Sequence, residues 1–102
     1  MSEIPASFRQ RYAALQQRFR DELPARLRHI MEAGEKWLAD ADADTAQVFR
    51  QAVHKLAGSA GNYGFAEITR LCQQIEADLQ TLDAGARQRI RRHLQQLGEQ
   101  PR

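Results

Sequence analysis

The stretch HKLAGSAGNYGF, residues 54–65, decides the fold and points to the chemistry of this 102-residue chain. It continues a helical pattern of apolar residues, yet it contains three glycines. A glycine inside a helix costs about 0.5–1 kcal/mol relative to alanine. The simplest reason to accept that cost is that another molecule must approach this helix closely, next to its single histidine, His54.

The position of His54 follows from helix geometry, because successive residues are rotated by about 100°. The residues that share the expected core face are Val48, Phe49, Ala52, Val53, Leu56 and Ala60. His54 lies opposite this face, with Gly58 and Gly61 one and two turns further on and with Arg50 and Gln51 before it. The sequence therefore predicts an accessible imidazole among small and polar residues.

An exposed imidazole can bind a metal, carry a proton or act as a nucleophile. A metal site is not expected, because His29 and His93 are distant in sequence, Cys72 is the only cysteine, and no HExxH or CxxC motif is present. Acid–base catalysis needs a second polar group in a cleft, and no convergent set is visible. These residues favour a nucleophile that accepts a group and passes it on, above all a phosphoryl group.

The same stretch resembles the signature H-x-L-K-G-S-x-x-x-x-G of histidine-containing phosphotransfer domains. The residues that match in identity and spacing are His54, Leu56, Gly58, Ser59 and Gly64, and segments 19–27 and 71–76 resemble the family's flanking helices. The resemblance implies one such domain over residues 1–102. It also implies a phosphorelay role, in which His54 attacks a receiver domain's phospho-aspartate through Nε2 and then passes the phosphoryl group to a second receiver.

The resemblance further implies partners and site residues. The partners are response-regulator receiver domains and a hybrid sensor histidine kinase, and the receiver supplies Mg²⁺, so that this chain needs no cofactor. The chain is then a carrier without kinase activity of its own, because no ATP-binding glycine loop is present. The expected docking residues are Gln51, Gly58, Ser59, Gly61 and Asn62.

One position departs from the family pattern. Ala57 occupies the place three residues after the histidine where the family usually has lysine or arginine. Lys55, which is adjacent in sequence, is the first candidate to supply the missing charge next to the phosphoryl group, and Arg50 is the second.

Composition sets wider limits. With 42% hydrophobic and 27% charged residues, the chain is typical of one small globular domain. It has no apolar run of membrane length and no signal peptide, and its single cysteine cannot form an internal disulfide, so we expect it in the cytoplasm. We also expect a monomer. The formal net charge of +2 does not by itself indicate nucleic-acid binding.

Periodicity predicts an all-α fold, an up-and-down antiparallel four-helix bundle with an additional N-terminal helical segment. Apolar stripes run through residues 8–19, 23–38, 68–82 and 86–97, and Pro24 is expected to kink or break the first helical region. The predicted caps are Asp21, a capping box of Asp44 with Gln47, and Asp83. Cys72 and Trp37 are expected to pack inside or at the rim, Gly34 to allow close helix packing, and His29 and His93 to lie at the surface.

Two other functions remain open. The cluster Arg87, Arg89, Arg91 and Arg92 could form a basic nucleic-acid-binding helix, although cations near a helix C-terminus also suit its dipole. Alternatively, Ala57 could mark a helical interaction module that is not phosphorylated.

Overall fold

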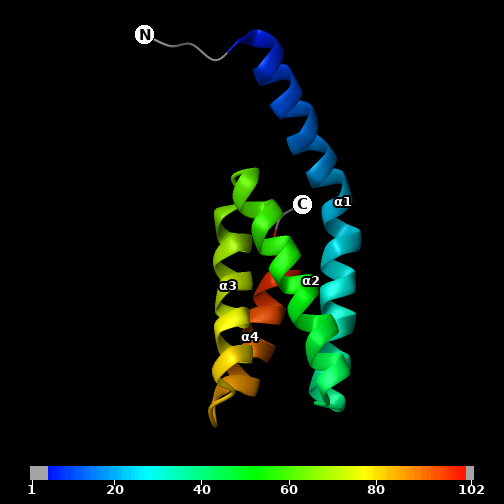
Figure 1. The fold of residues 1–102 in the computed structure, drawn as a ribbon, viewed down its shortest axis with the longest axis vertical. Helices are drawn as coiled ribbons and strands as arrows, with labels where there is room; N and C mark the ends of the chain where they lie inside the picture. The colour runs from blue at the N-terminus through cyan, green and yellow to red at the C-terminus, as the bar shows by residue number, and fades with distance from the viewer. Residues whose placement is uncertain (1–4, 101–102) are drawn as a thin grey trace.

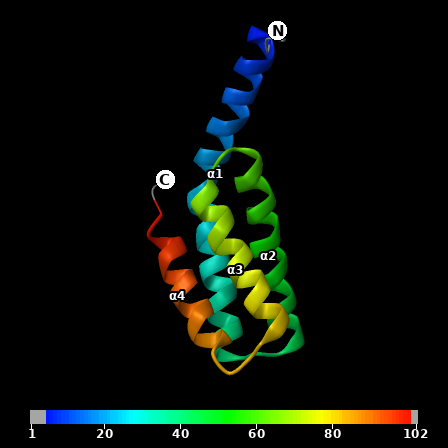
Figure 2. The same cartoon turned by 90° about the vertical axis from the view of Figure 1, so that its left-hand side faces the viewer.

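The computed structural model describes residues 5–100 and contains, within that range, four α-helices and no strand. They are α1 (Ala6–Ala39), α2 (Ala43–Asn62), α3 (Ala66–Thr81) and α4 (Ala86–Gly98). The helices run alternately up and down, each packs against the next, and α4 returns to α1 (Figures 1 and 2). The predicted all-α, antiparallel four-helix bundle is confirmed.

The core lies between the four helices and is built from the apolar face of each. Gly34 lets α1 approach its neighbours closely, since a Cβ there would lie 2.7 Å from Leu94 Cδ1. Trp37 and Cys72 are both buried, as expected, and burial raises the pKa of the Cys72 thiol to about 12, with the nearby charge of Glu76 adding to the shift. The thiol is therefore a small core group rather than a reactive one.

The N-terminal helical segment is present, but it is not a separate element. The helix α1 runs without a break through Pro24, and Asp21 lies inside it and caps nothing. Proline removes one backbone donor, yet the flanking Leu23 and Leu27 are fully buried and hold the helix against the core. Figure 1 shows the result as a bend, with the blue N-terminal part of α1 leaning relative to the cyan part.

The apolar stripe at the start of α1 does not reach the core. Phe8, Tyr12 and Leu15 are exposed, and Phe19 is the first buried residue of α1. The reason is length, because α1 has 34 residues and extends past the end of the other helices (Figures 1 and 2). Val48 of α2 and Leu82 after α3 were likewise expected inside and are exposed, since Val48 lies at the edge of the core face and Leu82 ends its helix with a φ of 47°.

The cap of α2 is Asp42, two residues earlier than the predicted Asp44. The Asp42 carboxylate accepts a hydrogen bond from the Thr45 backbone N–H at 2.8 Å. Thr45 also donates its hydroxyl to the Asp40 carbonyl at 2.6 Å, which holds the incoming loop. Asp44 already lies in the first turn, where its charge still suits the helix dipole.

The connections on either side of α3 depend on one glycine and one aspartate. Gly64 has a φ of +83°, a conformation that favours glycine, and it lets the Phe65 N–H return to the Ala60 carbonyl at 2.9 Å. Asp83 does not cap α4 with its side chain, because the cap position is Gly85. It instead accepts the Gly85 N–H at 3.0 Å and so shapes the turn before the helix.

Candidate functional site

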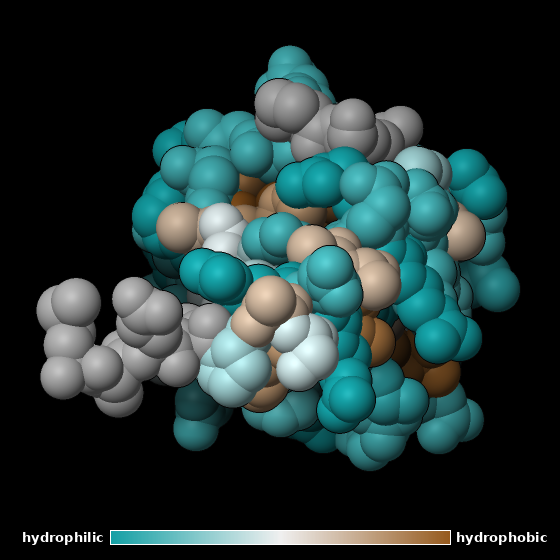
Figure 3. Space-filling model, turned by 90° about the horizontal axis from the view of Figure 1, so that it is seen from above, coloured by the Kyte–Doolittle hydropathy of each residue, from teal (hydrophilic) through white to brown (hydrophobic). Residues whose placement is uncertain are grey.

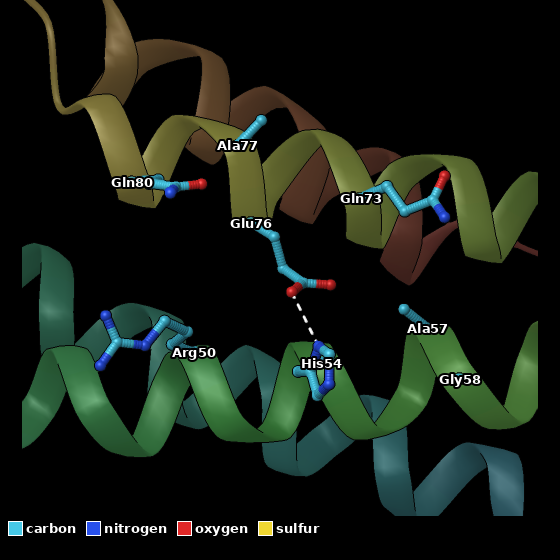
Figure 4. Close-up of a pocket in the computed structure, with 8 residues that line it drawn as sticks. All are labelled: Arg50, His54, Ala57, Gly58, Gln73, Glu76, Ala77 and Gln80. Atoms are coloured by element: carbon cyan, nitrogen blue, oxygen red, sulfur yellow. Dashed lines mark hydrogen bonds and ion pairs between the residues drawn. The ribbon is translucent and has the colours of Figure 1, made fainter.

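His54 lies on the outer face of α2, and its side chain is 76% exposed. Its Nδ1 is 2.9 Å from Oε2 of Glu76, which reaches across from α3 (Figure 4). A carboxylate can only accept a hydrogen bond, so Nδ1 is the donor, and the neutral ring then carries its free lone pair on Nε2. Among residues 5–100, no hydrogen-bond partner occupies Nε2. The arrangement presents one nucleophilic nitrogen to the solvent.

His54 lies beside an open groove between α2 and α3. The residues that line it are Arg50, His54, Ala57, Gly58, Gln73, Glu76, Ala77 and Gln80 (Figure 4). A Cβ added at Gly58 would meet nothing within 4 Å, so packing within the chain does not require glycine at this position. Together with the short side chains of Ala57 and Ala77, Gly58 leaves the space next to the imidazole unobstructed.

The two candidate cations flank His54 differently. Arg50 lines the groove with Glu76, but its guanidinium donates to Gln47 and points away from the imidazole in Figure 4. Lys55 borders a separate hollow between α1 and α2. Both also border a third hollow that includes His54. Neither forms an ion pair with another described residue.

The predicted docking residues all lie on α2 but differ in exposure. Gln51, Gly58, Gly61 and Asn62 are exposed, whereas Ser59 is half-buried and offers less of its side chain to a partner. A Cβ at Gly61 would make only ordinary contact with Thr69, 3.8 Å from its Oγ1. The structure therefore places most of these residues where a partner can reach them, along the outer face of α2.

His29 is exposed as predicted, but His93 is not a surface residue. Its side chain is only 16% exposed, and its Nδ1 lies 3.9 Å from Asp78 Oδ2 without a hydrogen bond. Burial lowers the pKa of His93, and the charge of Asp78 only partly opposes this effect. The helical spacing from Ile90 and Leu97 could have revealed it, because three or four residues along α4 place His93 next to the core face.

Nothing in the described range suggests a metal site or a membrane span. No group of three His, Cys, Asp or Glu side chains between residues 5 and 100 is placed to hold a metal ion. Over the same residues, no helix combines the length and apolar character needed to cross a membrane.

Two of the four clustered arginines serve the packing of α4. Arg87 donates to the Leu38 carbonyl and lies over the Trp37 ring, 5.2 Å from its centroid. Arg89 pairs with Asp78 at 3.0 Å and with Asp83 at 2.7 Å. These contacts raise the pKa of Arg89 and lower that of Asp83. Much of the charge that suggested a basic helix is therefore engaged within the chain.

Comparison with known proteins gives one family. Residues 14–100 match the family model of the Hpt domain, a range that begins inside α1 and includes all of α2, α3 and α4. No curated protein and no solved structure gave a significant match.

Proposed function

The chain belongs to the Hpt domain family, whose members are phosphocarrier modules of phosphorelays, and on that premise we propose that His54 is its phosphoryl acceptor. The observation that carries this proposal is the exposed imidazole whose Nδ1 binds Glu76 at 2.9 Å, which leaves Nε2 to react. His93 is partly buried, and His29 is exposed but has no carboxylate of residues 5–100 bound to its ring, so neither combines exposure with a hydrogen-bonded Nδ1.

In the proposed step, the Nε2 lone pair attacks phosphorus on the phospho-aspartate of a receiver domain. The Nε2–P bond forms while the bond between phosphorus and the aspartate oxygen breaks, and the electron pair leaves with the carboxylate. The ring then carries positive charge, part of which rests on Nδ1–H, directly beside the Glu76 carboxylate. Transfer to a second receiver reverses these bonds, so that positioning and electrostatics account for most of the catalysis.

We further propose that the chain acts as a monomeric carrier in the cytoplasm, between a hybrid sensor histidine kinase and a response regulator. The receiver contributes Mg²⁺, and this chain contributes the nucleophile, the open groove beside Gly58 and a nearby cation, Lys55 or Arg50. In this scheme it has no kinase activity and no cofactor of its own.

The direct test compares His54→Gln with His29→Gln, a matched change at another exposed histidine. Both variants should keep the helical circular dichroism of the wild type, because neither side chain is in the core. Incubation with phosphorylated receivers should label wild type and His29→Gln with an acid-labile, alkali-stable phosphate, and should leave His54→Gln unlabelled. Full labelling of His54→Gln would refute the assignment.

A further inference from the structure

The first turns of α1 carry a second unusual surface, separate from the groove beside His54. Phe8, Tyr12 and Leu15 are 57%, 39% and 42% exposed, and their spacing places them on one side of the helix. Residues 5–20 contain four arginines and no acidic residue. At about 100° per residue, these arginines border the apolar stripe on both edges, with Arg9 and Arg20 on one and Arg11 and Arg18 on the other.

This segment is held in place against the α2–α3 connection. The Tyr12 hydroxyl donates to the Asn62 carbonyl at 2.8 Å, and Gln16 Nε2 donates to the Tyr63 carbonyl at 2.8 Å. The Tyr12 and Tyr63 rings lie 6.0 Å apart. The apolar stripe therefore faces the end of the bundle, and α1 extends beyond that end (Figures 1 and 2).

Seen from this end of the bundle, the surface carries both apolar and polar side chains. Figure 3 shows small tan and brown apolar areas enclosed by teal polar side chains. The side chains of Arg9 and Arg11 are exposed and form no hydrogen bond or ion pair with any described residue. By contrast, Arg20 lies over the Phe65 ring, 5.4 Å from its centroid, and Arg18 pairs with Glu22 at 3.5 Å.

We propose that this corner, defined by Phe8, Tyr12 and Leu15 with Arg9 and Arg11, is a second docking surface for the receiver that exchanges phosphate with His54. The occupant is an apolar element of the receiver bordered by aspartate or glutamate. This inference rests on the proposed function and adds to it the part of the chain that selects the partner.

Distance and charge both favour this occupant. Asn62 is eight residues after His54, or about 12 Å along α2, and Tyr12 contacts Asn62 directly. A domain of about 100 residues has a radius of gyration near 13 Å, so a receiver centred on His54 spans that distance. A second copy of this chain would bring another acid-free, four-arginine segment to the corner, and a flat anionic membrane cannot enter the angle between α1 and the bundle end.

The test uses the full chain and measures the initial rate of transfer against receiver concentration. The variants are Phe8→Gln/Leu15→Gln and Arg9→Glu/Arg11→Glu, all at exposed positions. The matched controls are Leu82→Gln, an exposed leucine outside the corner, and Arg91→Glu/Arg92→Glu on α4. Labelling of His54 by phosphoramidate, a small donor that needs no docking, reports the intrinsic reactivity of the imidazole in every variant.

We expect each corner variant to raise the receiver concentration for half-maximal rate at least about five-fold, which is the loss typical of a contributing interface residue. The saturating rate and the phosphoramidate labelling should stay at wild-type values, and the controls should behave as wild type. The arginine variant should also lose most of the salt dependence of transfer.

Four results would overturn the inference. Corner variants that bind and transfer like the controls would refute it alone, while the proposed function would stand. Light scattering that shows a wild-type dimer converted to monomer by these variants would assign the corner to a second copy. Co-sedimentation of the wild type, but not the variants, with phosphatidylglycerol vesicles would assign it to a membrane. If no receiver labels wild-type His54, the proposed function fails and the inference fails with it.

Discussion

The contact between Glu76 and His54 gives the sharpest prediction, because one side chain controls both the tautomer and the charge next to the reacting ring. Glu76→Gln keeps an oxygen that can accept from Nδ1–H but removes the negative charge. Glu76→Ala removes both. We therefore expect the rate of His54 phosphorylation to fall in the order wild type, Glu76→Gln, Glu76→Ala.

The size of the effect follows from geometry and exposure. Opposite charges about 4 Å apart attract by about 1 kcal/mol in bulk water and about 4 kcal/mol at an effective dielectric constant near 20. The His54 side chain is 76% exposed and that of Glu76 is 29% exposed, so the aqueous limit is the better guide. A loss of about 1–1.5 kcal/mol of transition-state stabilisation in Glu76→Gln corresponds to a rate about five- to twelve-fold lower.

The assay is single-turnover labelling of His54 by phosphoramidate, which isolates the chemistry from docking. Glu67→Gln is the matched control, because Glu67 is the other glutamate of α3, is exposed and does not contact His54. Imidazole ¹⁵N NMR gives an independent reading, with the proton on Nδ1 in wild type and distributed between both nitrogens in Glu76→Ala. Wild-type rates in Glu76→Ala, with an unchanged tautomer, would refute the reasoning.

Three further outcomes test the rest of the site and the core. Gly58→Leu should slow transfer from a receiver at least about five-fold without lowering the melting temperature, since a Cβ there meets nothing within 4 Å; unchanged transfer would show that close approach does not explain this glycine. At least one of Arg50→Ala and Lys55→Ala should slow transfer from a receiver about three- to ten-fold, and the double variant at least as much. A wild-type transfer rate in the double variant would contradict this and would assign all the positive charge to the partner. The free energy of unfolding should fall as the pH drops from about 7.5 to 5.5. The reason is that burial lowers the pKa of His93 in the folded chain, whereas the unfolded chain binds a proton near the ordinary histidine pKa of about 6.5. In urea titrations His93→Gln should weaken this pH dependence, and equal pH slopes for the variant and the wild type would contradict the prediction.

The local pattern of the sequence determined the helices and the exposure of the reactive group. Apolar residues three and four apart define the buried face of α2, and His54 lies opposite that face whatever the other helices do. These features depend on residues within one or two helical turns of each other, and the periodic pattern of apolar residues is informative over that range.

Only the tertiary structure decided which side chains meet across helices. Glu76 is 22 residues from His54, and its contact with Nδ1 depends on how α2 and α3 are rotated and shifted against each other. The burial of His93 beside Asp78 and the passage of α1 through Pro24 depend in the same way on packing against neighbouring helices. Helical periodicity fixes the direction of each side chain around its own axis, but the relative rotation and offset of two helices come from side-chain interlocking between segments distant in sequence.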